Sequence, residues 1–223
     1  MAHFFPSDSW VKALMEDLNN SEAYAEAAKI IRSGAHGKVL SAVFRRIAAT
    51  PLASWENWLQ TEERSGLCPL DLHIHDSDFI LYAFGAPKSV TSRGAGFEAG
   101  RLDHIISCFD YGDGALIAAE GSWIHADGYG FEMSFNVSME KATLACGPDL
   151  KMRLCERDGG TKEIEVPPGD GYGLELAHFV DCIATGETPL SDGRSGLRIV
   201  KILEAAHESM ASDGSPVKIE PMR

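Results

Sequence analysis

Residues 65–85, SGLCPLDLHIHDSDFILYAFG, combine ionisable side chains with an apolar run. Five of the eight positions from 71 to 78 are aspartate or histidine, with leucine and isoleucine between them. That density is rare in a packed core, because a buried charge is stable only when it is paired. We therefore expect this stretch to carry a functional site.

Two conformations of the stretch imply different chemistry. In a helix, Asp71 and His75 stand at positions i and i+4 and meet on one face, where the carboxylate can orient the imidazole, and Asp78 follows one turn later. In a strand, Asp71, His73 and His75 all point to one side, which is how a strand presents metal ligands. The first geometry gives half of an acid/base site, and the second gives a metal site.

The residues that follow favour the helix. Apolar residues continue the pattern through position 84, and Gly85 with Pro87 supplies a helix stop. Pro69 suits the first helical turn, where its missing N–H costs nothing. The pattern predicts a helix from about Pro69 to Phe84.

The overall composition is that of an ordinary globular protein. Of the 223 residues, 44% are hydrophobic and 24% are charged, and no apolar run approaches the ~20 residues that span a membrane. The net charge of −13 disfavours nucleic acid and anionic membranes, which bind clustered lysine and arginine. The five cysteines lack a C-x-x-C pair, which argues against a disulfide framework and a zinc ribbon. The N-terminus has no secretory pattern, so we expect a cytoplasmic protein.

Helical periodicity dominates both ends of the chain. Residues 1–20 form an amphipathic N-terminal extension with a stripe of Trp10, Leu14 and Leu18, and Ser21–Ser33 forms the next helix. Near the C-terminus we expect helices at Tyr172–Thr185 and Asp192–Ala211. Their inward residues are expected to be Leu176, Phe179, Val180 and Ile183 in the first helix and Leu197, Val200, Leu203 and Ala206 in the second.

Strand patterns fill the middle of the chain. Lys38–Ala48 is a strand that carries Arg45 and Arg46, and the loop after it carries Trp55 and Trp58. Further strands are expected at Ser89–Arg93, Leu102–Tyr111, Ala115–Trp123, Tyr129–Val137, Ala142–Ala145, Met152–Glu156, Thr161–Val166 and Val217–Ile219. Asp-Gly turns at 113–114 and 158–160 predict hairpins, so most of the pairing is antiparallel.

These elements predict an α+β fold in which an open, mostly antiparallel sheet carries helices on one face. We expect one domain over residues 21–223. The other face of the sheet lacks a cover, so a second copy or another domain should bind there, and we expect a homo-oligomer. No strand is followed by G-x-G-x-x-G and a helix, and there is no Walker motif, so no Rossmann domain is expected.

Three separated motifs resemble the C-terminal domain of the Gfo/Idh/MocA (glucose-fructose oxidoreductase / inositol dehydrogenase / MocA) oxidoreductases, over roughly residues 21–220. IIRSGAHGKV with AVFRR resembles the opening helix and strand of that domain. DLHIHDSDF resembles its D-x-x-x-H helix, and LELAHFVDCIATGETPLSDGRSGLRIVKILEAAHESM resembles its closing helices. The motifs occur in the order that is usual for the family.

The resemblance implies a dehydrogenase site. His75 would be the general base that takes the proton from a substrate hydroxyl, and Asp71 would orient it. The family uses NAD or NADP and acts on sugars, cyclitols and related hydroxy compounds. Its usual nucleotide-binding domain and E-K-P motif are missing here, since Glu140-Lys141-Ala142 is no equivalent. The resemblance therefore implies either a truncated product or half of an enzyme that is completed by another chain, which would hold the nucleotide.

Sugar sites combine aromatic faces with a few polar groups, which suggests substrate-binding side chains around His75. We expect Trp58 or Trp55, Arg45 or Arg46, Trp123 and His178 in these positions.

Two other functions remain open from the sequence. D-x-H-x-H at a strand end would suit a metal-dependent hydrolase, with further ligands among His104, His125, His178 and His207. A domain retained only for assembly through its sheet would carry the Asp71 and His75 pair without using it.

Overall fold

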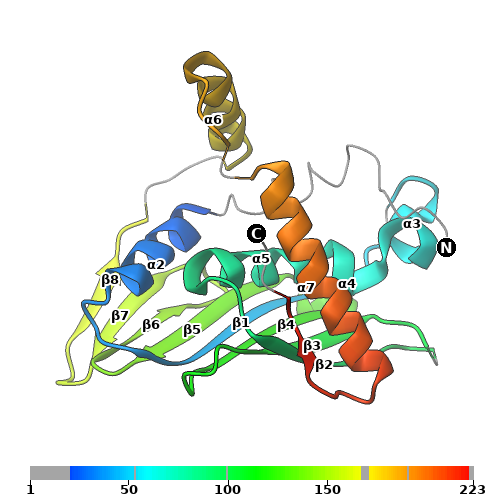
Figure 1. Cartoon of the computed structure of the whole chain (residues 1–223), viewed down its shortest axis with the longest axis horizontal. Coiled ribbons are helices and arrows are strands. Elements are labelled where there is room, and N and C mark those ends of the chain that lie inside the picture. Colours follow the sequence, from blue (N-terminus) through cyan, green and yellow to red (C-terminus); the bar gives the residue numbers. More distant parts are fainter. Residues whose placement is uncertain (1–20, 53, 99, 167–170, 190, 221–223) are drawn as a thin grey trace.

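Nine strands form one sheet at the base of the molecule in the computed structural model, which describes residues 21–220 except 53, 99, 167–170 and 190 (Figure 1). Their order across the sheet is β8-β7-β6-β5-β1-β4-β3-β2-β9. The predicted helix within residues 1–20 lies outside the described residues. The strands are β1 (Val39–Ala49), β2 (Ser89–Ala95), β3 (His104–Asp110), β4 (Leu116–His125), β5 (Glu132–Met139), β6 (Ala142–Cys146), β7 (Met152–Glu156), β8 (Thr161–Ile164) and β9 (Val217–Lys218).

The strand pairing is antiparallel except between β1 and β4. The predicted hairpins join β3 to β4 and β7 to β8, and Gly114 and Gly159 in these turns have φ of 89° and 99°, which favour glycine. Strands β1 and β4 can be parallel because the chain crosses over through the central helices between them. The predicted α+β fold with an open, mostly antiparallel sheet is confirmed.

Helices cover one face of this sheet (Figure 1). They are α2 (Ser21–Ser33), α4 (Leu67–Asp71), α5 (His73–Phe84) and α7 (Gly193–Ala211). The connection from β1 to α4 contains a 3₁₀ helix, η1 (Trp55–Gln60), and the short α3 (Glu62–Ser65), while another 3₁₀ turn, η2 (Asp127–Tyr129), precedes β5. No described helix is both long enough and apolar enough to cross a membrane.

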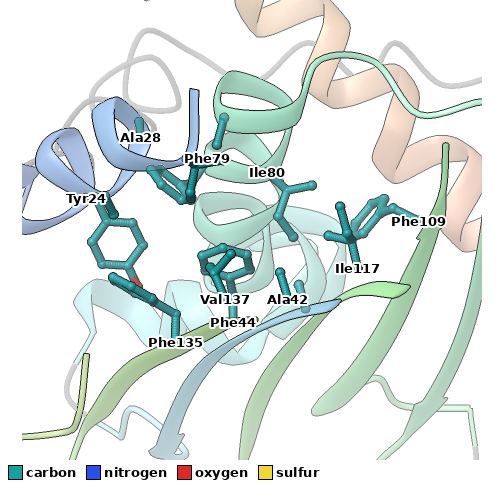
Figure 2. Close-up of a cluster of buried hydrophobic side chains, with 14 of the residues drawn as sticks. Tyr24, Ala28, Ala42, Phe44, Phe79, Ile80, Phe109, Ile117, Phe135 and Val137 are labelled. Atoms are coloured by element: carbon teal, nitrogen blue, oxygen red, sulfur yellow. The ribbon is translucent and has the colours of Figure 1, made fainter. Parts of the chain in front are cut away.

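The core lies between α2, α5 and the middle strands of the sheet (Figure 2). The Tyr24 ring meets the Phe79 and Phe135 rings edge-on, with centroids 4.7 and 5.2 Å away, and Phe44 lies 5.3 Å from Phe79. Each such pair contributes about 0.5–1.5 kcal/mol beyond the burial of its surface. These ring contacts therefore hold α2 and α5 together in one helical layer that packs on β1 and β5 of the sheet.

A second, smaller cluster supports α4. Leu67, Cys68 and Leu72 pack there against Ile105 of β3 and Trp123 of β4. Because this cluster is separate from the main core, α4 and α5 rest on the sheet through different contacts.

The inward faces predicted for the last two long helices are only partly correct. α6 (Gly171–Thr185) stands away from the sheet in Figure 1, and Leu176, Phe179, Val180 and Ile183 are exposed. In α7, Leu203 and Ala206 are buried as predicted, but Leu197 and Val200 are exposed. The buried face of α7 is rotated from the predicted one, because Ile199 and Ile202 are buried there and were not predicted to face inward. The predicted apolar face of α6 has no cover among the described residues.

Candidate active site

The central stretch is helical, but it forms two helices instead of one. α4 ends at Asp71 and α5 begins at His73, and the joint between them is Leu72, with φ −106° and ψ −51°. The strand geometry required by the hydrolase hypothesis is therefore absent. In the described part of the chain, no three histidine, cysteine, aspartate or glutamate side chains are grouped so that they could hold a metal ion.

The ionisable residues of this stretch divide between two sides. Asp71, His75 and Asp78 are partly exposed, whereas His73 and Asp76 are completely buried. Asp71 and His75 both have interaction partners in the structure. Burial raises the pKa of Asp78 to about 6, so its carboxyl group titrates near neutral pH. The partly exposed side thus presents two carboxyl groups and one imidazole.

Asp76 is held in a buried ion pair. Its two carboxylate oxygens accept hydrogen bonds from Nε and Nη2 of Arg46, both at 3.2 Å, and the Tyr24 hydroxyl donates to it at 3.3 Å. Arg46 comes from β1 and Tyr24 from α2, so this contact joins three elements. Arg46 therefore has a structural role beneath α5.

His73 is buried one turn before Asp76. Its Nε2 lies 2.9 Å from the Ser107 hydroxyl, while Nδ1 has no hydrogen-bond partner among the described residues. Burial, with smaller effects from His207 and His104, lowers the pKa of His73 to about 3. His73 is therefore neutral throughout the physiological range and is not a candidate base.

The backbone that leads into α4 is unusual. Gly66 and Leu67 both have left-handed φ, at 72° and 56°. The side chains of Leu67 and Cys68 are buried in the second cluster, so they point away from the exposed side of α4. Leu67 and Cys68 therefore do not cover the exposed side of α4 next to Asp71.

The predicted aromatic candidates lie on the loop that contacts α4. The Arg64 guanidinium stacks on both indoles, with Cζ 4.7 Å from the Trp58 centroid and 5.6 Å from the Trp55 centroid. Trp58 is partly buried, whereas Trp55 is 74% exposed. A role for Trp58 in substrate binding stays a prediction, and Trp55 offers the more accessible ring.

The structure does not bring the other predicted substrate-binding residues to the exposed side of α4 and α5. Arg45 lies on the uncovered face of the sheet, where it bonds Glu120 at 2.9 Å and Glu132 at 2.8 Å, because neighbouring strand residues point to opposite faces. Trp123 is only 2% exposed and packs beneath α4. His178 lies on α6, where its ring contacts the Cys182 thiol at 3.6 Å.

Sequence reasoning also missed the buried anchors His73 and Asp76 and the joint at Leu72. Serine at 107 and arginine at 46 are ordinary strand residues in the sequence, and only the fold brings them to α5. Gly121 could have indicated that α5 packs closely on β4 near His73, because a glycine inside an apolar strand often marks the close approach of another backbone.

Comparison with known proteins identifies the fold. The family description "GFO/IDH/MocA C-terminal domain" matches residues 24–145, more than half of the chain. The chain is 25% identical over 215 residues to scyllo-inositol 2-dehydrogenase (NAD(+)) of Bacillus subtilis (strain 168), a match that covers 90% of this chain and 60% of the relative.

Two solved structures share the fold. Levoglucosan dehydrogenase, in complex with NADH and levoglucosan, aligns with a TM-score of 0.79 and 17% identity over 92% of this chain and 65% of that chain. Aldose-aldose oxidoreductase from Caulobacter crescentus, complexed with glycerol, aligns with a TM-score of 0.74 and 21% identity over 87% and 60%. The chain thus spans less than two thirds of the length of these relatives, and it belongs to the Gfo/Idh/MocA family through the C-terminal domain of that family.

Proposed function

We propose that this chain is the substrate-binding and catalytic-base half of an NAD(P)-dependent oxidoreductase that acts on a sugar, cyclitol or related polyhydroxy compound. The observation that carries the proposal is the partly exposed side of α4 and α5, which presents Asp71, His75 and Asp78 on this family fold. The relatives named above include a cyclitol dehydrogenase and sugar oxidoreductases, which supports this substrate class.

In this proposal His75 takes the proton from a substrate hydroxyl while a hydride leaves the carbon atom that bears this hydroxyl. NAD or NADP supplies the hydride acceptor when bound. Asp71 orients the His75 imidazole and favours its protonated form, because a nearby carboxylate stabilises the positive charge. Asp78 lies about one helical turn after His75 on the partly exposed side of α5, and its carboxyl group, with a pKa of about 6, would hydrogen-bond a second substrate hydroxyl.

The nucleotide needs a second binding surface in this proposal. The described sheet is antiparallel except for one pair of strands, so it is not the parallel dinucleotide-binding sheet. Among the described residues, the exposed side of residues 66–71 adjoins Asp71, and the side chains of Leu67 and Cys68 point inward there. We therefore propose that another chain or domain holds the nucleotide against this side.

A ligand panel tests the proposal. Isothermal titration calorimetry with scyllo-inositol, levoglucosan, sorbose and glycerol should detect binding of at least one compound to the wild-type chain. His75→Gln and Asp71→Asn should weaken that binding by up to about tenfold, since the first removes the imidazole that accepts the substrate hydroxyl and the second removes the carboxylate that orients it. The matched control His36→Gln lies in the turn before β1, where it pairs only weakly with Glu156 at 3.8 Å, and should bind normally. Binding that is unchanged in His75→Gln would refute the assigned site.

We also propose a homo-oligomer that forms through the uncovered face of the sheet. Val43, Ile106 and Leu116 are exposed there, and Leu116 has 75% of its surface accessible. In sedimentation velocity the wild-type chain should be an oligomer and Leu116→Arg should be a monomer. Leu52→Arg, at an exposed loop position, should remain an oligomer. A monomeric wild-type chain would contradict this assembly.

We place this function in the cytoplasm. All five cysteines are free thiols, which fits a reducing compartment.

A further inference from the structure

Helix α5 meets the sheet at one point of unusually close approach. A Cβ atom added to Gly121 of β4 would lie 2.7 Å from the Cβ, 3.1 Å from the Cα and 3.3 Å from the backbone nitrogen of His73. None of these atoms is the end of a flexible side chain, so nothing can swing aside. The first turn of α5 can therefore lie at this depth only because residue 121 is glycine.

Directed hydrogen bonds hold the same turn in place. His73 Nε2 bonds the Ser107 hydroxyl, which lies 2.8 Å from the Ser92 hydroxyl, and the Ser92 backbone N–H donates to Ser209 Oγ at 2.8 Å. The chain of bonds runs from α5 through β3 and β2 to α7. It fixes the direction of the His73 ring, which an apolar contact would not do.

Asp76 supplies a second directed anchor three residues later, toward β1 and α2. Apolar side chains alone allow a helix to rotate slightly about its axis, because dispersion contacts have no preferred angle. Two directed anchors at positions i and i+3 on the buried side remove that freedom. The hydrogen bonds of His73 and Asp76 therefore also fix the direction in which His75 points from the opposite face of α5.

This matters because Asp71 and His75 lie on different helices. α4 rests on the cluster around Trp123, while α5 packs on the main core with His73 and Asp76 as its directed contacts, and Leu72 joins the two helices. The distance between the Asp71 carboxylate and the His75 imidazole thus depends on how α5 is set against the sheet.

We propose that His73, seated on Gly121 and bonded to Ser107, is the positioning residue that sets His75 against Asp71. The inference rests on the proposed function, because it concerns the same acid/base pair. His73 has no contact with the reacting atoms in this proposal and acts only through the placement of α5.

The test is the coupling between Asp71 and His75, measured without any nucleotide. The pKa of His75 is obtained from its imidazole NMR signals, which are assigned by their loss in His75→Gln. In the wild-type background, Asp71→Asn should lower this pKa by about one unit, the usual effect of losing an adjacent carboxylate. In the Gly121→Ala background, the same substitution should shift it by less than half as much. Gly196→Ala lies at a helical position where no described atom beyond the neighbouring residues and the helix's own backbone comes within 4 Å of the added carbon, so it should leave the coupling intact.

A second pair of variants separates positioning from folding. His73→Gln keeps a donor that can reach Ser107 and should retain the coupling, whereas His73→Leu should lose it while circular dichroism still shows a folded chain. Full coupling in both Gly121→Ala and His73→Leu would overturn the positioning role and leave the proposed function standing. No coupling in the wild type would overturn the pair itself, and with it both proposals.

Discussion

The buried ion pair between Arg46 and Asp76 gives a sharp test of how α5 is held. Arg46→Met keeps most of the aliphatic volume of the arginine but removes both hydrogen bonds to the carboxylate, each 3.2 Å long. Hydrogen bonds to a charged group contribute roughly 1.5–3 kcal/mol each. The carboxylate would remain completely buried, with Tyr24 as its other recorded hydrogen-bond donor. We expect a loss of about 3–5 kcal/mol, the usual cost of breaking a buried pair.

Urea unfolding monitored by circular dichroism measures this loss. With a slope of roughly 2–3 kcal/mol per molar urea for a chain of this size, the midpoint should fall by about 1–2.5 M. Arg153→Met is the matched control, because Arg153 also pairs with an aspartate, Asp149, at 3.2 Å, but on the surface. It should cost less than about 1 kcal/mol.

An apolar replacement of the whole group checks the physical reason. Most of the cost of Arg46→Met comes from an unpaired buried charge, so adding Asp76→Leu and Tyr24→Phe should recover most of the stability. The reasoning would be refuted if Arg46→Met cost no more than Arg153→Met, or if the triple variant were less stable than the single one.

Three further predictions concern the buried side of α5 and its neighbour Asp78. Ser77→Ala should be neutral or stabilising in urea unfolding, because the buried Ser77 hydroxyl has no hydrogen-bond partner among the described residues; a loss above about 1 kcal/mol would show a partner. The His73 pKa of about 3 lies below its unfolded value of 6.5, so the unfolded chain binds a proton first and stability falls as pH drops from 6.5 toward 3. Relative to His73→Gln, the wild type should therefore lose about 1.4 kcal/mol per pH unit in this window, and a constant difference would contradict the burial of a neutral ring. The Asp78 pKa is raised from 3.8 to about 6, so ionisation destabilises the folded state above pH 6 and the penalty disappears as pH falls to 3.8. Asp78→Asn should thus be more stable than the wild type at pH 8 but not at pH 4, and equal stability at both would refute the shift.

Local patterns in the sequence were sufficient for most of the fold. Alternation located the strands, including Met152–Glu156 to the residue, and Asp-Gly turns located the hairpins. The helical reading of the central stretch followed from its length and from Gly85, which does cap α5. These features depend on residues close in sequence, so periodicity and turn chemistry are enough to find them.

Contacts between distant residues were not predictable in the same way. The joint at Leu72 has no glycine or proline at that position, and the next residue, His73, closely approaches Gly121, which is 48 positions away. Arg45 and Arg46 were interchangeable in the sequence, but strand direction sends one to the uncovered face and the other beneath α5. The exposure of α6 could not be predicted, because an apolar helix face does not reveal which surface covers it.

The central claim is that the proton-accepting half of the site lies on this chain and the nucleotide is held elsewhere. Titration of the wild-type chain with NADH and NADPH, followed by the fluorescence of its four tryptophans, tests this directly. We predict no saturable change at micromolar nucleotide, with or without a bound polyol. Saturable binding of either nucleotide at micromolar concentration by this chain alone would contradict the claim.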